Sequence, residues 1–299
     1  MAETSAIEWT DATVNFWWGC TKVSPGCDHC YAESWNAFRG NGEWGPGAPR
    51  RVIKGAAGLL KTLQRKSTAF YQDHHRKPRV FMSSMCDLFD NEVDADLRLP
   101  ALRSAAEAPG MHIQMLTKRV GNVLPMVPPE WEKQWPQHIG LMISVCTERE
   151  AKRDIWKLRS LKEFYRIPWV GISMEPMLAP INPPDLKGID WIIVGGESGK
   201  NSRPLHPAWV AHIQRACKDA GVAFFFKQWG EWLPDGEAAA DVFQSLRRAG
   251  VETMELHADP SPFATVRFDT RTMYRAGKKR SGGLLNGELF HAFPKELQL

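Results

Sequence analysis

Seven short apolar runs alternate along this chain with polar, helix-compatible stretches, and no other feature limits the choice of fold as strongly. The runs are rich in β-branched and aromatic residues and are the predicted strands: Val14–Trp18, Arg79–Ser83, His112–Thr117, Ile139–Val145, Trp169–Met174, Trp191–Val194 and Ala223–Lys227. Helices are predicted between them, near Arg50–Gln72, Asp94–Ala108, Arg149–Phe164 and Pro207–Ala220. Near-continuous apolar strands are typical of parallel sheets covered on both faces. The alternation therefore predicts an α/β fold of βα units in an open or closed barrel.

The pattern becomes less regular after Trp232, so we expect two parts of unequal size. Residues 1–232 are predicted to form the barrel core, and residues 233–299 a small C-terminal extension or lid. Within the extension we expect a strand at Ala264–Phe268 and a solvated basic loop at Arg275–Arg280. The 299 residues suffice for one large core with such an appendage.

Composition points to a cytoplasmic protein without a membrane partner. No apolar run approaches the roughly 20 residues that span a bilayer, and the N-terminus lacks the basic start of a signal peptide. The net charge of +4 is too small to indicate nucleic-acid binding by itself. Nothing in the pattern indicates an oligomeric state. Because cytoplasmic thiols stay reduced, the six cysteines are poor candidates for disulfides.

Three of those cysteines form a local cluster with the spacing Cys-x6-Cys-x2-Cys: Cys20, Cys27 and Cys30. A cluster of this kind in a reducing compartment favours a metal site or catalysis. Three thiolates on a four-iron cluster leave one iron open to a ligand, whereas electron-transfer clusters usually have four cysteine ligands. Zinc is the alternative, with His29 or a distant Cys86 or His74 as fourth ligand. A redox-active thiol ranks third.

Polar or glycine residues follow six of the predicted strands, in the segments FMSSMCD, MLTKR, SVCTERE, GISMEP, IVGGESG and FFKQWG. In α/β folds the chemistry collects at the carboxyl ends of parallel strands, so six such ends predict a single site. The alternative for each segment is an ordinary helix cap, such as Thr147 with Glu150 in a capping box. GGESG lacks the Lys-Ser/Thr of a P-loop.

The motifs IEWTDATVNFWWGCTKVSPGCDHCYAE, SSMCDLF, LTKR, ISMEPML, IVGGESG and FFKQWGEW together resemble the phage three-cysteine-motif proteins. These are radical-SAM-like proteins of phages and mobile elements. The cysteine spacing differs from the usual Cys-x3-Cys-x2-Cys of radical S-adenosylmethionine (SAM) enzymes, and His29 stands where that signature has an aromatic residue. The resemblance covers about residues 7–232. It implies a partial (βα) barrel of the radical SAM type, a [4Fe-4S] cluster and SAM as cofactors, and a reductase or other electron donor as partner.

The resemblance also implies roles for individual residues. Cys20, Cys27 and Cys30 would ligate the cluster. Glu175 follows a predicted strand, and from this position we expect it to face the site as a catalytic carboxylate. Ser83, Ser84 and Asp87 are expected to bind the methionyl amino group of SAM, and Ser144 and Thr147 its ribose. His29 is expected at the adenine edge. Gly195, Gly196 and Glu197 are the other expected SAM contacts, because two glycines let a ligand approach the backbone closely.

Four basic residues at strand ends favour an anionic substrate: Lys118, Arg119, Arg203 and Lys227. We therefore expect a radical SAM enzyme that generates a 5′-deoxyadenosyl radical and acts on a nucleotide or a DNA base. The most specific form of this hypothesis is an isomerase that remodels an amino-acid-modified thymidine in phage DNA hypermodification. The alternative from the cysteines and the charge is a zinc-stabilised nucleic-acid-binding protein without catalysis.

Overall fold

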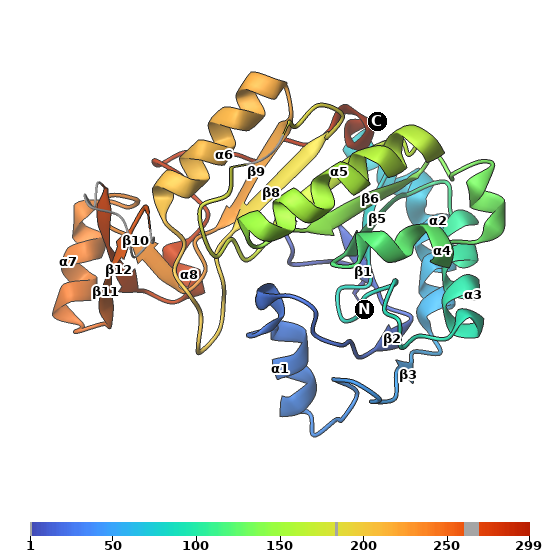
Figure 1. The fold of residues 1–299 in the computed structure, drawn as a ribbon, viewed down its shortest axis with the longest axis horizontal. Coiled ribbons are helices and arrows are strands. Elements are labelled where there is room, and N and C mark those ends of the chain that lie inside the picture. Colours follow the sequence, from blue (N-terminus) through green and yellow to red (C-terminus); the bar gives the residue numbers. More distant parts are fainter. Residues whose placement is uncertain (1, 183–184, 260–268) are drawn as a thin grey trace.

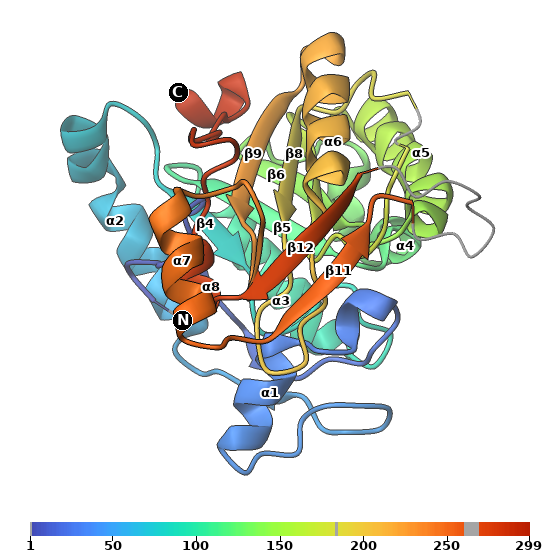
Figure 2. The same ribbon diagram turned by 90° about the vertical axis from the view of Figure 1, so that its left-hand side faces the viewer.

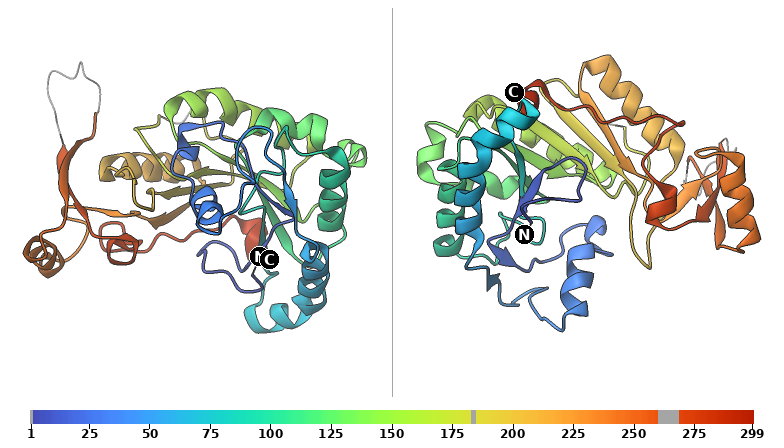
Figure 3. Two further views of the ribbon diagram at one scale, coloured as in Figure 1. Left: turned by 90° about the horizontal axis from the view of Figure 1, so that it is seen from below. Right: turned by 180° about the vertical axis from the view of Figure 1, so that it is seen from behind.

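A curved parallel sheet of seven strands forms the centre of the molecule in a computed structural model, which describes residues 2–182, 185–259 and 269–299 (Figure 1). The strand order is β1-β4-β5-β6-β7-β8-β9, and every neighbouring pair is parallel. The bounds are β1 Ala12–Val14, β4 Arg79–Met82, β5 His112–Thr117, β6 Ile139–Ser144, β7 Val170–Met174, β8 Trp191–Gly195 and β9 Ala223–Gln228. The strands follow an arc rather than a plane (Figure 3). The predicted partial (βα) barrel is confirmed.

Helices cover the convex outer face, because each βα connection returns the chain over that side of the sheet (Figures 1 and 3). They are α2 Ala56–His74, α3 Ala95–Ala106, α4 Val123–Met126, α5 Glu148–Tyr165 and α6 Pro207–Ala220. The predicted capping box is present, since the Thr147 side chain accepts from the Glu150 amide and Glu150 reaches back to the backbone of Thr147. Gly221, with φ +69°, ends α6 in the left-handed conformation that glycine adopts without strain.

Alternate strand residues face the concave inner side, as the period of two requires. Away from the carboxyl ends of the strands, this inner side carries an apolar cluster that includes Phe81, Met142, Ile193 and Phe225. The C-terminal segment closes this part of the barrel: Leu297 belongs to the same cluster. The C-terminal chain also adds to the edge strand β9, where the amide of Phe226 donates to the carbonyl of Phe290 at 2.7 Å.

The first predicted strand is partly wrong. Only its start belongs to the parallel sheet, because β1 ends at Val14 and the chain leaves the sheet at Asn15. The buried Asn15 side chain takes the place of strand pairing: its Nδ2 donates to Ser84 Oγ at 2.9 Å, and its Oδ1 accepts from the Met85 amide at 2.8 Å. Trp17–Trp18 then forms β2, which pairs antiparallel with β3, Arg51–Val52.

The region after Trp232 begins with a separate antiparallel sheet of order β10-β12-β11, shown with helix α7 in Figure 2. Its elements are β10 Trp232–Pro234, α7 Ala240–Arg248, β11 Thr253–His257, β12 Thr270–Arg275 and α8 Lys278–Ser281. The loop expected at Arg275–Arg280 is thus wrong in part, because it covers the end of β12 and most of α8. The strand expected at Ala264–Phe268 lies outside the described residues. The division into 1–232 and 233–299 stays a proposal.

The remaining elements are short: η1 Pro25–Cys27, α1 Tyr31–Phe38, η2 Val120–Asn122, η3 Pro129–Glu132 and η4 Lys295–Gln298. None of the helices in the described part of the chain is both long and apolar enough to cross a membrane.

Candidate active site at the carboxyl edge of the sheet

A row of polar positions lies above the apolar cluster on the inner wall. Along each strand, the residue two positions after an inner-face residue returns to the same face. Ser144 follows Met142 in this way, Gly195 follows Ile193, and Lys227 follows Phe225. The inner positions at this edge are Ser83, Lys118, Ser144, Ser173, Glu175, Gly195 and Lys227. The parallel topology therefore gathers strand ends that are remote in sequence, as predicted.

Glu175 and Lys227 form an ion pair across the top of this wall. Lys227 Nζ lies 2.7 Å from Glu175 Oε1, and Ser173 Oγ donates to Glu175 Oε2 at 3.2 Å. Strand β8 runs between the two partners, and a Cβ atom at Gly195 would come 3.0 Å from Glu175 Oε1. Glycine at this position leaves room for the carboxylate. Three predicted site residues on three strands are thus in one place.

The cysteine loop lies over the same edge, and Arg119 holds its first half. The Arg119 guanidinium donates to the carbonyl of Thr21 at 2.6 Å and to Asp87 Oδ2 at 3.0 Å, and it lies 3.7 Å from Cys20 Sγ. Asp87 also accepts from Thr117 Oγ1 at 2.8 Å and from the Lys118 amide at 3.1 Å. The Asp87 carboxylate therefore fixes the ends of β4 and β5 to the loop through a buried ion pair.

Arg203 holds the second half of the loop. Its guanidinium binds both oxygens of Glu197, at 2.8 and 2.6 Å, and also donates to the Pro25 carbonyl at 2.9 Å and to Asp28 Oδ2 at 3.3 Å. His29 Nδ1 lies 3.1 Å from Glu197 Oε2. Burial favours the neutral acid, but the hydrogen bonds from Arg203 and His29 outweigh it, so the pKa of Glu197 is lowered.

The surroundings of Cys20 and Cys30 favour the protonated thiol. Burial, together with the charge of Asp87, raises the pKa of Cys20 to about 12. Burial also raises the pKa of Cys30, although the amides of Glu33 and Ala32 act in the opposite direction. Thiolates in such a place need a cation beside them, and a bound metal or cluster supplies one.

The cysteine loop supplies three soft sulfur donors beside the cationic Lys118, and this donor set suits an iron–sulfur cluster or zinc. In the side-chain positions of the described residues, no three His, Cys, Asp or Glu side chains are close enough together to hold a metal ion. Cys20 faces Arg119, whereas the charges of Cys27 and Cys30 act on Lys118. Binding of a metal or cluster by three thiolates would thus require these side chains to come closer together than they are here.

Two further cysteines lie against the loop: Cys86, which the sequence suggested as a distant zinc ligand, and Cys146, which sequence reasoning did not place there. Cys86 forms a parallel bridge with Gly19 beside Cys20. Cys146 lies so close to Gly26 that a Cβ atom on Gly26 would come 2.2 Å from Cys146 Sγ. Both cysteines stand in the strand-end segments SSMCD and SVCTE, which was the available signal.

The other predicted residues have varied surroundings. Ser83 is buried with φ +76°, and its side chain interacts with the Cys86 thiol, where its hydrogen bond acts against the rise in the pKa of Cys86 that burial causes. Ser84 accepts from Asn15 through its hydroxyl and from Tyr31 through its carbonyl, the latter at 2.7 Å. The Thr147 hydroxyl caps α5. A Cβ atom on Gly196 would come 1.9 Å from the Trp229 carbonyl oxygen, so this glycine permits close approach of two backbone segments.

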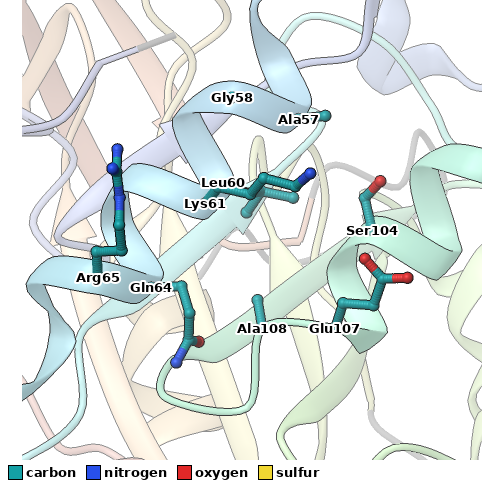
Figure 4. Close-up of a pocket in the computed structure, with 9 residues that line it drawn as sticks. All are labelled: Ala57, Gly58, Leu60, Lys61, Gln64, Arg65, Ser104, Glu107 and Ala108. Carbon is teal, nitrogen blue, oxygen red and sulfur yellow. The ribbon is translucent and has the colours of Figure 1, made fainter.

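A pocket of about 510 Å³ lies elsewhere, between α2 and α3 on the outer side of the molecule (Figure 4). Its lining includes Lys61, Gln64 and Glu107, and it contains none of the predicted site residues. The candidate active site is therefore the carboxyl edge itself and not this groove.

Comparison with known proteins gives one family and a set of structural similarities. The chain is similar to spore photoproduct lyase complexed with dinucleoside spore photoproduct, at 9% identity and a TM-score of 0.41, over 92% of this chain and 71% of that chain. A mutant spore photoproduct lyase with bound AdoMet and dinucleoside spore photoproduct has 9% identity, a TM-score of 0.40 and the same coverage. No curated protein matches the chain. The model of the family described as "Protein of unknown function (DUF5131)" matches residues 4–294, and the chain belongs to that family.

Proposed function

We propose that this protein is a radical SAM enzyme in which Cys20, Cys27 and Cys30 ligate a [4Fe-4S] cluster. The observation that carries the proposal is the position of the cysteine loop. Arg119 and Arg203 tie it over the carboxyl edge of a parallel half-barrel, facing the polar inner wall. Held by Cys20, Cys27 and Cys30, such a cluster would supply the electron for reductive cleavage of bound SAM into methionine and a 5′-deoxyadenosyl radical.

The surrounding residues would bind SAM and orient it. Ser83, Ser84 and Asp87 follow β4, where acceptor oxygens suit the methionyl ammonium. The Asp87 carboxylate would have to release one of the groups it holds in order to bind it. Ser83 is buried at this edge beside the Cys86 thiol. The remaining SAM contacts that we propose are Ser144 for the ribose, His29 for the adenine edge, and Gly195 and Glu197 at the end of β8. Thr147 and Gly196, which the sequence also suggested, are engaged by the cap of α5 and by the Trp229 carbonyl.

An anionic substrate, a nucleotide or a DNA base, fits the charges at this edge. Lys118 is half-buried there, and its ammonium forms no hydrogen bond or ion pair within the described ranges. Arg119 and Arg203 hold the loop and are paired with carboxylates, so among the four predicted basic residues Lys118 is the cation that stays available to a substrate. Glu175 and Lys227 can each bind a group of opposite charge once their own pair opens. The finest version that we propose is an isomerase acting on an amino-acid-modified thymidine in phage DNA hypermodification, with electrons from a reductase.

Anaerobic reconstitution with iron and sulfide tests the proposal. We expect brown protein with about four irons per chain and thiolate-to-iron charge-transfer absorbance. We also expect 5′-deoxyadenosine when SAM and a reductant are added. Colourless protein with one tightly bound zinc would overturn the proposal and favour a zinc-stabilised nucleic-acid-binding protein. A reconstituted cluster that leaves SAM intact would refute the radical mechanism but not the assignment of the cluster ligands.

A further inference from the structure

Helix α1, which follows directly on Cys30, exposes three aromatic side chains. Tyr31, Trp35 and Phe38 are 58%, 39% and 88% exposed. Their spacing of i, i+4 and i+7 places them on one face of the helix. Apolar helix faces are usually buried, and a row of exposed rings beside a candidate active site indicates a surface for binding.

A cation extends this aromatic face. The ring of Trp35 stacks on Trp18, with centroids 4.8 Å apart, and the Arg39 guanidinium lies 3.7 Å from the Trp35 ring centroid. Arg39 is exposed and has no ion pair among the residues that the structure describes. A planar guanidinium with no acidic partner can stack on a base and can bind a phosphate.

The short helix α8 supplies a second group of cations. Lys278, Lys279 and Arg280 are exposed, and none of the three forms an ion pair within the described ranges. Backbone hydrogen bonds tie the segment around α8 to the residues that follow β9. The amide of Gly277 donates to the carbonyl of Glu231 at 3.0 Å, and the Trp229 amide donates to the Gly282 carbonyl at 3.0 Å.

The loop that follows β8 joins the two surfaces. On one side Glu231 Oε1 accepts from the Gly199 amide at 3.1 Å, and on the other Arg203 bonds to Pro25 and Asp28 of the cysteine loop. Figures 1, 2 and 3 show α1 and α8 on the same side of the sheet, the side toward which β8 and β9 run. The aromatic face and the cations of α8 therefore flank the candidate active site.

We propose that α1 and α8 together bind a single-stranded stretch of nucleic acid and present one of its bases to the active site. Bases of any sequence stack on exposed rings, and lysine and arginine neutralise the phosphates between them. An enzyme that reacts with a base must take that base out of the stack. The proposal rests on the function given above and specifies a polymeric substrate instead of a free nucleotide.

Fluorescence anisotropy with a labelled 15-nucleotide oligothymidylate and reconstituted protein tests this surface. We expect Phe38→Ala to raise Kd by about fivefold or more without changing the salt dependence, since stacking is uncharged. The triple variant Lys278→Ala, Lys279→Ala, Arg280→Ala should lower the slope of log Kd against log salt by about 2, because each neutralised phosphate contributes about 0.7. Arginine in place of Lys278 and Lys279 should restore the slope.

Matched controls lie on the outer face of the molecule. Phe164, on α5, is 76% exposed, and Lys61 and Arg65 line the pocket of Figure 4. Phe164→Ala and Lys61→Ala with Arg65→Ala should leave Kd and the slope unchanged. Unchanged binding in Phe38→Ala and in the triple variant would overturn the proposal, as would equal affinity for thymidine monophosphate and the oligonucleotide. SAM cleavage by wild-type protein is measured separately, so failure of this surface and failure of the radical mechanism are distinguishable.

Discussion

Arg203 and Pro25 are 178 positions apart, yet the Arg203 guanidinium donates to the Pro25 carbonyl at 2.9 Å. The same guanidinium binds both carboxylate oxygens of Glu197. The segment that carries Cys27 and Cys30 is therefore positioned from the end of β8. Any cluster held by these cysteines would depend on this contact for its place in the site.

Replacing Arg203 by Lys should loosen that half of the loop. Lysine retains the charge but lacks the planar fork that binds Glu197 and Pro25 at once. We expect faster amide hydrogen exchange over residues 24–33, measured by mass spectrometry. Arg103→Lys, which changes an exposed pair with Glu130, is the control and should leave exchange there unaltered. Equal exchange in the two variants would contradict the assigned role.

Glu197 should make the protein sensitive to acid. Its pKa in the folded state is lowered from an ordinary value of 4.5, so its contribution to stability is complete above pH 4.5 and is lost as the pH falls through the folded value. Glu197→Gln should therefore have a lower free energy of unfolding than wild type at neutral pH, with the difference shrinking below pH 4.5. Urea titrations over this pH range measure it. If the difference in unfolding free energy between wild type and Glu197→Gln did not depend on pH, the Glu197 charge would not contribute to stability.

The buried pair of Arg119 and Asp87 should contribute strongly to stability. Both side chains are 7% exposed, and Arg119→Met would leave the Asp87 charge without its partner. We expect a loss of about 3–5 kcal/mol in the free energy of unfolding, measured by urea denaturation. Arg103→Met breaks an exposed pair and should leave the midpoint unchanged. A similarly small loss of unfolding free energy in both variants would mean that the pair of Arg119 and Asp87 contributes little to stability.

Two glycine substitutions should change the stability of the fold in opposite directions. A methyl group at Gly196 would collide with the Trp229 carbonyl, so Gly196→Ala should destabilise the fold by about 1–3 kcal/mol or more. Gly58 lies in α2 with nothing within 4 Å of an added Cβ, and Gly58→Ala should stabilise by about 0.5–1 kcal/mol. Thermal melting of both variants provides the comparison. A stable Gly196→Ala protein would argue against close approach of β8 and β9 at this point.

Cysteine variants separate the proposed ligands from structural thiols. We expect Cys27→Ala to abolish formation of 5′-deoxyadenosine and to lower the iron content after reconstitution. Cys217 is buried in α6 with no other role, so Cys217→Ala should leave SAM cleavage largely intact. Both quantities are measured on the same preparations by chromatography and iron analysis. Loss of activity in Cys217→Ala alone would contradict the assignment.

Much of the fold could be predicted because its signals are local. The apolar run at His112–Thr117 became β5 with the predicted bounds, and α6 follows the predicted helix at Pro207–Ala220. A proline at the first position and a left-handed glycine after the last mark that helix in the sequence itself. The strand predicted to continue past Val14 fails because the Asn15 side chain bonds to Ser84 and Met85, which lie far along the chain.

The sequence by itself determined the succession of strands β4 to β9 with helices α2, α3, α5 and α6, and the cysteine loop, since hydrophobic period, turn residues and spacing are local properties. It also placed polar residues at six strand ends. Only the tertiary structure decided which of these meet: Glu175 with Lys227, Asp87 with Arg119, and His29 with Glu197 across 168 positions. Such partners are set by the curvature and register of the sheet, and these arise from packing of the whole chain.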